Sequence, residues 1–356
     1  MGSEAQFVTT PAALRALLAE VGRPALLALD TEAASFHRYS DAICLVQLST
    51  RELTAVIDPL AVPDLRGIGA LVADPAVEIV FHDADYDLRL LGRDHGFHCT
   101  RLFDTRVAAQ LLNEPGIGLA ALLGKYLGIV LDKKFQRADW SERPLAPGML
   151  EYAAGDTTHL PALRDILHAQ LQAAGRLSWA EEEFERQATV RWEPEDPASA
   201  YLRIKGSGRL RGRQLAVLRE TYHWREATAK KLDRASFRVV NPDVVLAFAT
   251  IQPRTLDQLK AIKGISAGQV ERYGQEILAA VERGLAVREA ELPQIERGKR
   301  PPPDPAFDAR LERLKAVRTA AAERIGLAPG VLCPNGTLEQ VARMAPKSVE
   351  ELGQIP

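Results

Sequence analysis

The sequence is poor in cysteine, in aromatic residues and in long apolar runs. Among 356 residues there are 3 cysteines, and aromatic residues make up 6% of the chain. Cys44, Cys99 and Cys333 are widely separated, so they have neither the spacing of a zinc site nor that of a disulfide framework. They are expected to be buried thiols of a protein in a reducing compartment, which predicts a cytoplasmic location.

The lack of long apolar runs excludes a membrane protein of the helical class. No run approaches the ~18 residues that a spanning helix needs, and the N-terminus lacks the basic and then apolar pattern of a signal peptide. No membrane partner and no obligate protein partner are therefore expected. The length of 356 residues instead favours two or three globular domains.

A net charge of −2 conceals two parts of opposite sign. Residues 1–200 carry 18 Lys and Arg against 29 Asp and Glu, a net charge of −11. Residues 201–290 carry 17 against 9, a net charge of +8, and residues 291–356 carry 10 against 9, a net charge of +1. This asymmetry is typical of a metal-dependent enzyme joined to a nucleic-acid-binding module, although two halves that attract each other would have it too.

The first 190 residues have the pattern of an α/β domain with a mixed sheet. Strands are expected at 24–29, 42–49, 53–57, 77–81 and 102–104, and helices at 10–21, 65–73, 87–96, 105–113, 119–127 and 148–175. The second and third of these strands are close enough along the chain to form a hairpin. Thr10 is the expected cap of the first helix, and Pro11 is its first residue.

The rest of the chain predicts helices without convincing strands. Residues 209–285 are interrupted at Pro242, Pro253 and Gly264, which favours several short helices. Residues 308–356 repeat this pattern at an offset of 93 residues. The first copy continues through a further helix beyond the point that corresponds to residue 356, so the second copy is expected to be incomplete. Polar, proline-containing segments, at 192–197 and 299–303, predict linkers.

Four acidic residues and a tyrosine are the candidates for chemistry. Asp30 and Glu32 are two positions apart at the end of the first predicted strand, so their side chains point to the same face. Asp87 follows the fourth predicted strand, and Asp156 lies one helical turn after Tyr152. Carboxylates from distant elements can converge on two divalent cations roughly 3.5–4 Å apart, with positions left open for phosphate oxygens.

These residues fall into three motifs: Asp30-x-Glu32, His82-x-x-x-Tyr86-Asp87 and Tyr152-x-x-x-Asp156. The motifs resemble the three exonuclease motifs of the DEDD superfamily, in the subclass whose third motif carries tyrosine. The segments 45–48, 103–105 and 139–145 around them are similar to those of the ribonuclease D family. Residues 209–285 resemble the helicase-and-ribonuclease-D C-terminal (HRDC) module, and residues 308–356 resemble a shortened second copy.

The resemblance implies a ribonuclease H-like exonuclease domain, a mixed sheet flanked by helices, followed by all-α HRDC domains. The limits that we expect are an exonuclease domain at 1–192, a linker at 193–208, an HRDC domain at 209–290, a linker at 291–307 and an incomplete second HRDC-like domain at 308–356. The implied cofactors are two divalent metal ions, Mg²⁺ or Mn²⁺.

The implied activity is metal-dependent 3′→5′ exoribonuclease action that trims RNA 3′ ends, such as those of tRNA precursors or other structured RNA, and releases nucleoside 5′-monophosphates. By the pattern of the family, Asp30 would bridge the metals, Glu32 and Asp156 would hold the nucleophile-side ion, and Asp87 would serve the second ion. Tyr152 would orient the attacking water. A DNA 3′→5′ exonuclease, or an RNA-binding protein with a vestigial site, stays open as an alternative, because no motif shows a contact to the 2′-hydroxyl.

Other residues are candidates for contacts with nucleic acid. They are His82 after a strand, four cations ahead of the third motif, Lys133, Lys134, Arg137 and Arg143, and four cations of the basic module, Lys230, Lys231, Arg234 and Lys263. Each has a plain structural reading as well. His82 could be a satisfied internal group, and the cations could lie on solvated loops and helix faces.

Overall fold

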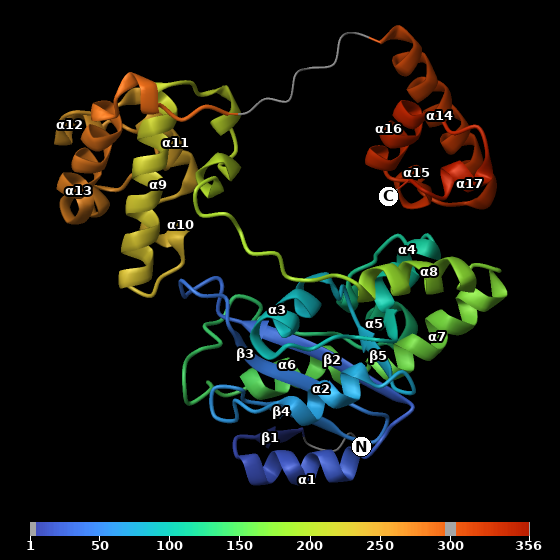
Figure 1. The fold of residues 1–356 in the computed structure, drawn as a ribbon. Coiled ribbons are helices and arrows are strands. Elements are labelled where there is room, and N and C mark those ends of the chain that lie inside the picture. The colour runs from blue at the N-terminus through green and yellow to red at the C-terminus, as the bar shows by residue number, and fades with distance from the viewer. Residues whose placement is uncertain (1–4, 296–303, 356) are drawn as a thin grey trace.

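The computed structural model describes residues 5–295 and 304–355. Figure 1 shows an N-terminal domain built around a sheet, and two separate groups of helices beside it, which we call the first and second helical modules. Residues 296–303, which fall within the predicted second linker at 291–307, lie outside the described residues. No described helix is both long enough and apolar enough to span a membrane.

The N-terminal domain contains one mixed sheet of six strands, which confirms the predicted fold class. The strands are β1 (Gln6–Val8), β2 (Leu26–Ala33), β3 (Ile43–Ser49), β4 (Thr54–Ile57), β5 (Glu78–Phe81) and β6 (Leu102–Asp104). Their order in the sheet is β1-β4-β3-β2-β5-β6. The predicted hairpin is confirmed, since β3 and β4 pair antiparallel, while β2 pairs parallel with β5. The strand β1 was not predicted, and it lies at the edge of the sheet, where it pairs parallel with β4.

Eight helices surround this sheet in the described part of the domain. They are α1 (Pro11–Val21), α2 (Arg66–Ala73), α3 (Asp85–His95), α4 (Thr105–Leu111), α5 (Leu119–Leu127), α6 (Met149–Thr158), α7 (Leu160–Ala173) and α8 (Leu177–Ala188). The side chain of Thr10 accepts a hydrogen bond from the amide of Ala13, as expected for a cap. The single helix expected at 148–175 is wrong. The chain leaves helical geometry at His159, and Pro161 has no N–H with which to continue the hydrogen bonding of α6.

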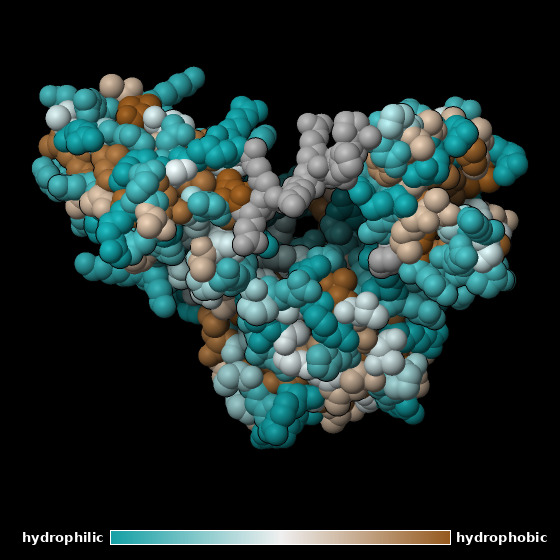
Figure 2. Space-filling view, turned by 45° about the horizontal axis from the view of Figure 1, so that its top comes forward, coloured by the Kyte–Doolittle hydropathy of each residue, from teal (hydrophilic) through white to brown (hydrophobic). Residues whose placement is uncertain are grey.

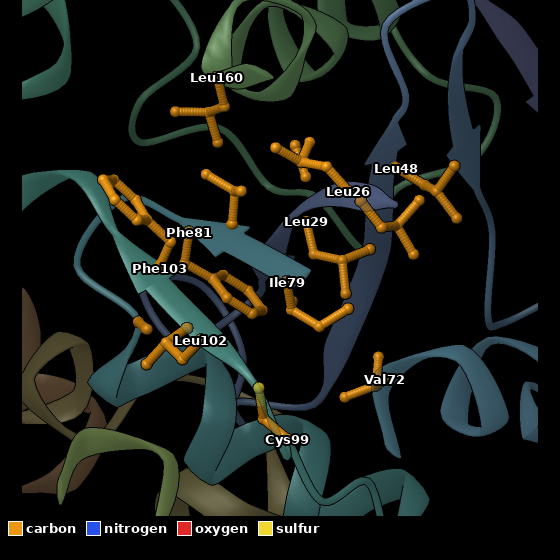
Figure 3. Packing of buried hydrophobic residues seen from close by; sticks show 14 of the residues in the cluster. Leu26, Leu29, Leu48, Val72, Ile79, Phe81, Cys99, Leu102, Phe103 and Leu160 are labelled. Atoms are coloured by element: carbon orange, nitrogen blue, oxygen red, sulfur yellow. The ribbon is translucent and has the colours of Figure 1, made fainter. Parts of the chain in front are cut away.

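The core between sheet and helices is almost entirely aliphatic (Figure 3). Leu29 of β2 and Ile79 and Phe81 of β5 have no exposed surface, and Leu160 at the start of α7 is 1% exposed. Complete burial of such a side chain contributes about 1.5–3 kcal/mol relative to exposure. This packing fixes β2 between β3 and β5, and the candidate carboxylates Asp30 and Glu32 are on β2.

The first helical module is an all-α bundle, as expected. Its elements are η1 (Ala200–Arg203), η2 (Ser207–Arg209), α9 (Arg213–Lys231), α10 (Ser236–Val239), α11 (Pro242–Ile251), α12 (Leu256–Lys260), α13 (Ala267–Ala286) and η3 (Glu289–Glu291). The helix boundaries fall at Pro242, Pro253 and Gly264, as predicted. Tyr201 and Ile204 are buried in the core of this module, so the extended stretch before it is shorter than the linker expected at 193–208.

The second helical module repeats the first. It contains α14 (Pro305–Ile325), α15 (Pro329–Leu332), α16 (Asn335–Met344) and α17 (Val349–Leu352). The helices α15 and α16 begin and end 93 residues after α10 and α11. In the described residues the module has no counterpart of α13. Its contact with the N-terminal domain includes the guanidinium of Arg176, which donates hydrogen bonds to the carbonyl oxygens of Leu111 and Ile325.

Candidate active site

Asp30 and Glu32 lie on one face of β2, beneath α6. In register on β3, Asp30 is opposite Gln47 and Glu32 is opposite Leu45. Leu45 packs in a cluster with Ala153 and Tyr152 of α6, so this helix covers the same face of the sheet. Both carboxylates lie within the strand rather than at its end, which corrects the expectation, because β2 continues to Ala33 with a register shift after Glu32.

Asp87 reaches the same region from the first turn of α3. It is 8% exposed, and the hydroxyl of Thr31 donates a hydrogen bond of 2.5 Å to its carboxylate. The two neighbouring aspartates are directed elsewhere: Asp83 pairs with Arg106, and Asp85 pairs with Arg89 at 2.8 Å. Of the three aspartates in this segment, Asp87 is the one whose charge interacts with that of Asp30.

The helix α6 supplies Tyr152 and Asp156 from one face. The ring of Tyr152 lies 5.9 Å from that of Trp140 and 6.0 Å from that of Phe135, which fix its position. Burial, together with the negative charges of Asp156, Glu32 and Asp30, raises the pKa of Tyr152 well above its usual value. The phenol is therefore protonated at neutral pH and can donate a hydrogen bond.

The four carboxylates form one electrostatic cluster. Burial raises the pKa of Asp30 well above its ordinary range, and repulsion from Asp87, Asp156 and Glu32 adds to this effect. Burial, followed by repulsion from Asp156 and Asp87, raises the pKa of Glu32 to about 9. Burial also raises the pKa of Asp87 and that of Asp156 to about 7. Within residues 5–295 and 304–355, none of the four forms an ion pair with Lys, Arg or His.

The donor set suits hard divalent cations. Carboxylate oxygens are the ligands that Mg²⁺ prefers, and a cation would offset the repulsion that raises these pKa values. Among the described residues, no group of three or more His, Cys, Asp or Glu side chains is arranged so that it could hold a metal ion. Mg²⁺ usually keeps several waters and takes one or two carboxylates, so it does not require such a group.

Gln47 is a further polar residue of this face. It is completely buried opposite Asp30, and both polar atoms of its amide lack a hydrogen-bond partner among the described residues. Leaving a buried polar group unpaired costs about 1–3 kcal/mol. The amide of Gln47 is therefore available to form hydrogen bonds with a ligand or a metal-bound water near Asp30. The position of Gln47 in an apolar strand did not indicate this role.

A cleft of about 860 Å³ opens beside α6. Tyr152, Asp156, His159, Lys134 and Phe135 are among the residues that line it. The ammonium of Lys134 lies 5.1 Å from the ring centroid of Phe135. Lys134 is one of the cations expected to contact nucleic acid, and in this cleft its ammonium could contact a phosphate bound next to Asp156.

The other candidates near the third motif have different surroundings. Arg143 donates to the carboxylate of Asp58 at 2.6 Å and to the carbonyl oxygens of Trp140, Glu142 and Cys44, so most of its donors stabilise the loop before α6. The guanidinium of Arg137 lies 5.7 Å from the ring of Phe36, and Lys133 is exposed.

The hydrogen bonds of His82 do not involve the four carboxylates. Its Nδ1 is 2.9 Å from the hydroxyl of Thr105, which in turn donates to the carbonyl oxygen of Phe81. Burial lowers the pKa of His82, so it is neutral at neutral pH. These contacts give His82 an internal structural role and leave its contact with nucleic acid a prediction.

The four cations of the basic module, Lys230, Lys231, Arg234 and Lys263, are exposed on the first helical module.

Thr31 and Asp104 are residues of this site that the sequence patterns did not single out. Thr31 holds Asp87, as described. Asp104 has no exposed surface, and its carboxylate accepts hydrogen bonds from the amides of Asp83 and Ala84 at 3.1 and 2.8 Å, while it also caps α4. It therefore fixes the turn that leads into α3 and Asp87. An aspartate directly before a predicted helix is a capping signal that could have identified it.

Comparison with known proteins finds family matches for the N-terminal domain and for the two helical modules. Residues 5–172 match a family described as 3′-5′ exonuclease, and residues 214–281 and 307–356 match the HRDC domain. Ribonuclease D of Granulibacter bethesdensis is 33% identical over 355 residues, which cover 97% of this chain and 88% of the relative. Ribonuclease D of Escherichia coli K12 is 32% identical over 81% of this chain and 77% of the relative.

The fold agrees with these matches. The crystal structure of Escherichia coli RNase D, described as an exoribonuclease involved in structured RNA processing, superimposes with a TM-score of 0.74 at 29% identity. The match covers 96% of this chain and 90% of that chain, so it includes the sheet and the helical modules.

Proposed function

Because this chain belongs to the ribonuclease D family and is a 3′→5′ exoribonuclease, we propose that it trims the 3′ ends of structured RNA such as tRNA precursors, using two divalent metal ions, Mg²⁺ or Mn²⁺. The observation that supports this site is the set of four carboxylates that converge from β2, α3 and α6 without cationic partners among the described residues.

Asp30, Glu32, Asp87 and Asp156 would hold the metal ions. Asp30, which is repelled by all three of the others, would contact both ions, Glu32 and Asp156 would contact one of them, and Asp87 would contact the other, as the pattern of the family implies. When bound, the ions lower the pKa of the attacking water and stabilise the charge of the transition state. The hydroxyl of Thr31 keeps Asp87 in place throughout.

Tyr152 would position the attacking water by a hydrogen bond from its hydroxyl. Its raised pKa makes it a donor rather than a general base at neutral pH. Lys134, which lines the same cleft as Asp156, would contact a non-bridging phosphate oxygen of the terminal nucleotide.

The domain limits and location remain part of the proposal. We propose an exonuclease domain at 1–192, HRDC domains at 209–290 and 308–356, and linkers between them, of which the first includes residues, Tyr201 and Ile204, that pack in the core of the first helical module. The first HRDC domain, with a net charge of +8, would supply RNA affinity that the acidic exonuclease domain lacks. The three cysteines are free thiols, which supports a location in the cytoplasm.

The test uses RNA and DNA oligonucleotides of the same sequence, each with a free or a blocked 3′ end. We expect release of nucleoside 5′-monophosphates from free RNA ends in Mg²⁺ or Mn²⁺, and none in the presence of a chelator. Internal cleavage, equal hydrolysis of DNA, or activity with the chelator present would each contradict the proposal.

A further inference from the structure

The first helical module has a recess between the end of α9 and the first half of α13, which we call the junction recess. Its volume is about 510 Å³. It is lined by Thr228, Lys231, Leu232, Arg234, Arg272, Tyr273 and Glu276. The sequence patterns did not single out Arg272, because the other cations of the recess, Lys231 and Arg234, are about forty positions away along the chain.

The cations of the junction recess are uncompensated. In the described ranges, Lys231, Arg234 and Arg272 form no ion pair and no side-chain hydrogen bond, and Arg272 lies 5.8 Å from the ring centroid of Tyr273. The one carboxylate of the recess, Glu276, accepts a hydrogen bond of 2.9 Å from Trp224 Nε1. A concave surface with excess positive charge attracts and concentrates polyanions.

Other cations of the same module are paired with carboxylates. Arg213 pairs with Glu289, and Arg225 pairs with Glu226. Both Arg219 and Arg283 pair with Glu220. Much of the positive charge of the module is therefore neutralised within the fold, whereas that of the junction recess is available to a ligand.

The recess borders the exonuclease domain. Asp233, between two residues of its lining, accepts a hydrogen bond of 3.3 Å from the amide of Tyr39 and pairs with Arg38 at 3.5 Å. The amide of Ala235 donates to the carbonyl oxygen of His37. Residues 37–39 belong to the connection that leaves β2 a few residues after Glu32. Figure 1 shows the lower end of α9 and α10 above this connection.

Aromatic and cationic side chains hold this junction together. The ring of Phe36 lies 5.2 Å from that of Phe237, and the guanidinium of Arg238 lies 4.9 Å from the Phe36 ring. The Nε of Arg238 also donates to the carbonyl oxygen of Phe36 at 2.8 Å. The position of the junction recess relative to the catalytic strand is thus set by specific contacts. Figure 2 shows a face of the molecule that is mainly hydrophilic, with hydrophobic patches on the helical modules.

We propose that the junction recess is a second binding subsite for the RNA substrate, which takes phosphates of the single-stranded segment upstream of the 3′ end in the active site. This rests on the proposed function. Lys231, Arg234 and Arg272 contact the phosphates, which positions the strand without reading its sequence. The junction keeps this subsite at a constant distance from Asp30, so it serves substrates that are long enough to reach both.

The experiment compares the wild-type protein with the double variant Arg234→Ala/Arg272→Ala on two single-stranded RNAs with the same 3′ sequence. One is a trinucleotide, and the other has about 16 nucleotides, the upper range for a single-strand binding module. The matched control is Arg254→Ala, since Arg254 is an exposed cation of the same module that does not line the recess.

For the double variant we expect KM for the longer RNA to rise about tenfold, with kcat unchanged and the trinucleotide unaffected. The salt dependence of RNA binding, measured with a chelator present, should fall by about 0.7 in logarithmic slope for each phosphate that the protein no longer neutralises. Arg272→Lys should restore much of the affinity, and Arg254→Ala should behave as the wild type.

An unchanged KM for the longer RNA would overturn the subsite. Equal losses on both RNAs would also overturn it, because they would show a disturbance that is transmitted to the active site. Preferential binding of an acidic peptide over RNA would assign the recess to a protein partner instead. Failure of the wild type to hydrolyse the trinucleotide would count against the proposed function alone, since RNA binding in chelator is measured separately.

Discussion

The exonuclease domain and the first helical module carry opposite charge, and they differ in which of their charged groups remain unpaired. In the exonuclease domain Asp83 and Asp85 pair with arginines, whereas Asp30 and Asp87 have no cationic partner among the described residues. In the first helical module Arg225 forms an ion pair with Glu226, whereas Arg272 forms no ion pair with any described residue.

This difference shows that charged groups without partners say more about the location of binding sites than the net charge of a domain does. A net charge of −11 or +8 describes a long-range field. Where several such groups gather without partners, they indicate where that field is used: carboxylates where metal ions would bind, and cations where phosphates would bind. Exposed ion pairs elsewhere contribute about 0–1 kcal/mol each and carry no comparable functional information.

The largest effect is expected at the centre of the unpaired carboxylates. Asp30→Asn should lower turnover by about 10³-fold or more, because metal ions supply several kcal/mol of transition-state stabilisation and each 1.36 kcal/mol is a factor of ten. Single-turnover hydrolysis of an RNA oligonucleotide in saturating Mg²⁺ measures it. Thermal unfolding in chelator is the control, where the variant should be at least as stable as the wild type, since one repelling charge is removed. Near-normal turnover would exclude the metal-bridging role.

Tyr152→Phe should have the next largest effect, a reduction of about 10²-fold in turnover. The ring still packs against Trp140 and Phe135, so only the hydroxyl that positions water is removed. KM for RNA should not change. An unaltered single-turnover rate would show that Tyr152 serves packing alone.

Gln47→Leu separates function from stability on the catalytic face. The apolar side chain removes a buried amide that has no partner among the described residues, so the temperature of unfolding in chelator should rise or stay the same. Turnover should fall about tenfold, and the Mg²⁺ concentration for half-maximal rate should increase, as for other groups that support metal ligands. A lower unfolding temperature with normal turnover would identify Gln47 as a structural residue.

The smallest effect is expected for substitutions of exposed lysines in the basic first helical module. Lys230→Glu/Lys231→Glu should raise KM for structured RNA several-fold and reduce the salt slope by about 0.7 for each phosphate that these lysines no longer neutralise. Turnover at saturating substrate should remain that of the wild type. The same reversal at Lys260, which pairs with Asp257, is a control for charge alone. Identical salt slopes in the variant and the wild type would mean that this surface faces something other than the substrate.

Local periodicity accounts for what could be predicted of the site. Asp30 and Glu32 share a face because side chains alternate along a strand, and Tyr152 and Asp156 share one because four positions complete about one helical turn. The helix ends at Pro242 and Gly264 and the repeat at an offset of 93 also follow from features that lie close together in the sequence.

Some failures are caused by long-range contacts. The short strand β1 is defined by its parallel pairing with β4, which the local pattern did not reveal. The break between α6 and α7 is different, because Pro161 is a local signal that the helix expected at 148–175 did not take into account. Arg143 has the sequence context of a phosphate contact, but its carboxylate partner Asp58 lies 85 positions earlier in the chain, where no local pattern connects the two.

The sequence by itself determined the α/β domain, the helical repeats, and the face on which each candidate carboxylate would lie. The tertiary structure decided which of the other charged groups have partners. Asp83 is as acidic as Asp87 in the sequence, but folding brought Arg106, 23 positions later in the chain, to Asp83, and no cation to Asp87 among the described residues. The pairs of Asp85 with Arg89 and of Arg225 with Glu226 join residues that are close in the sequence. Charge is a property of a residue, whereas its compensation depends on distance to groups that can be remote in the chain.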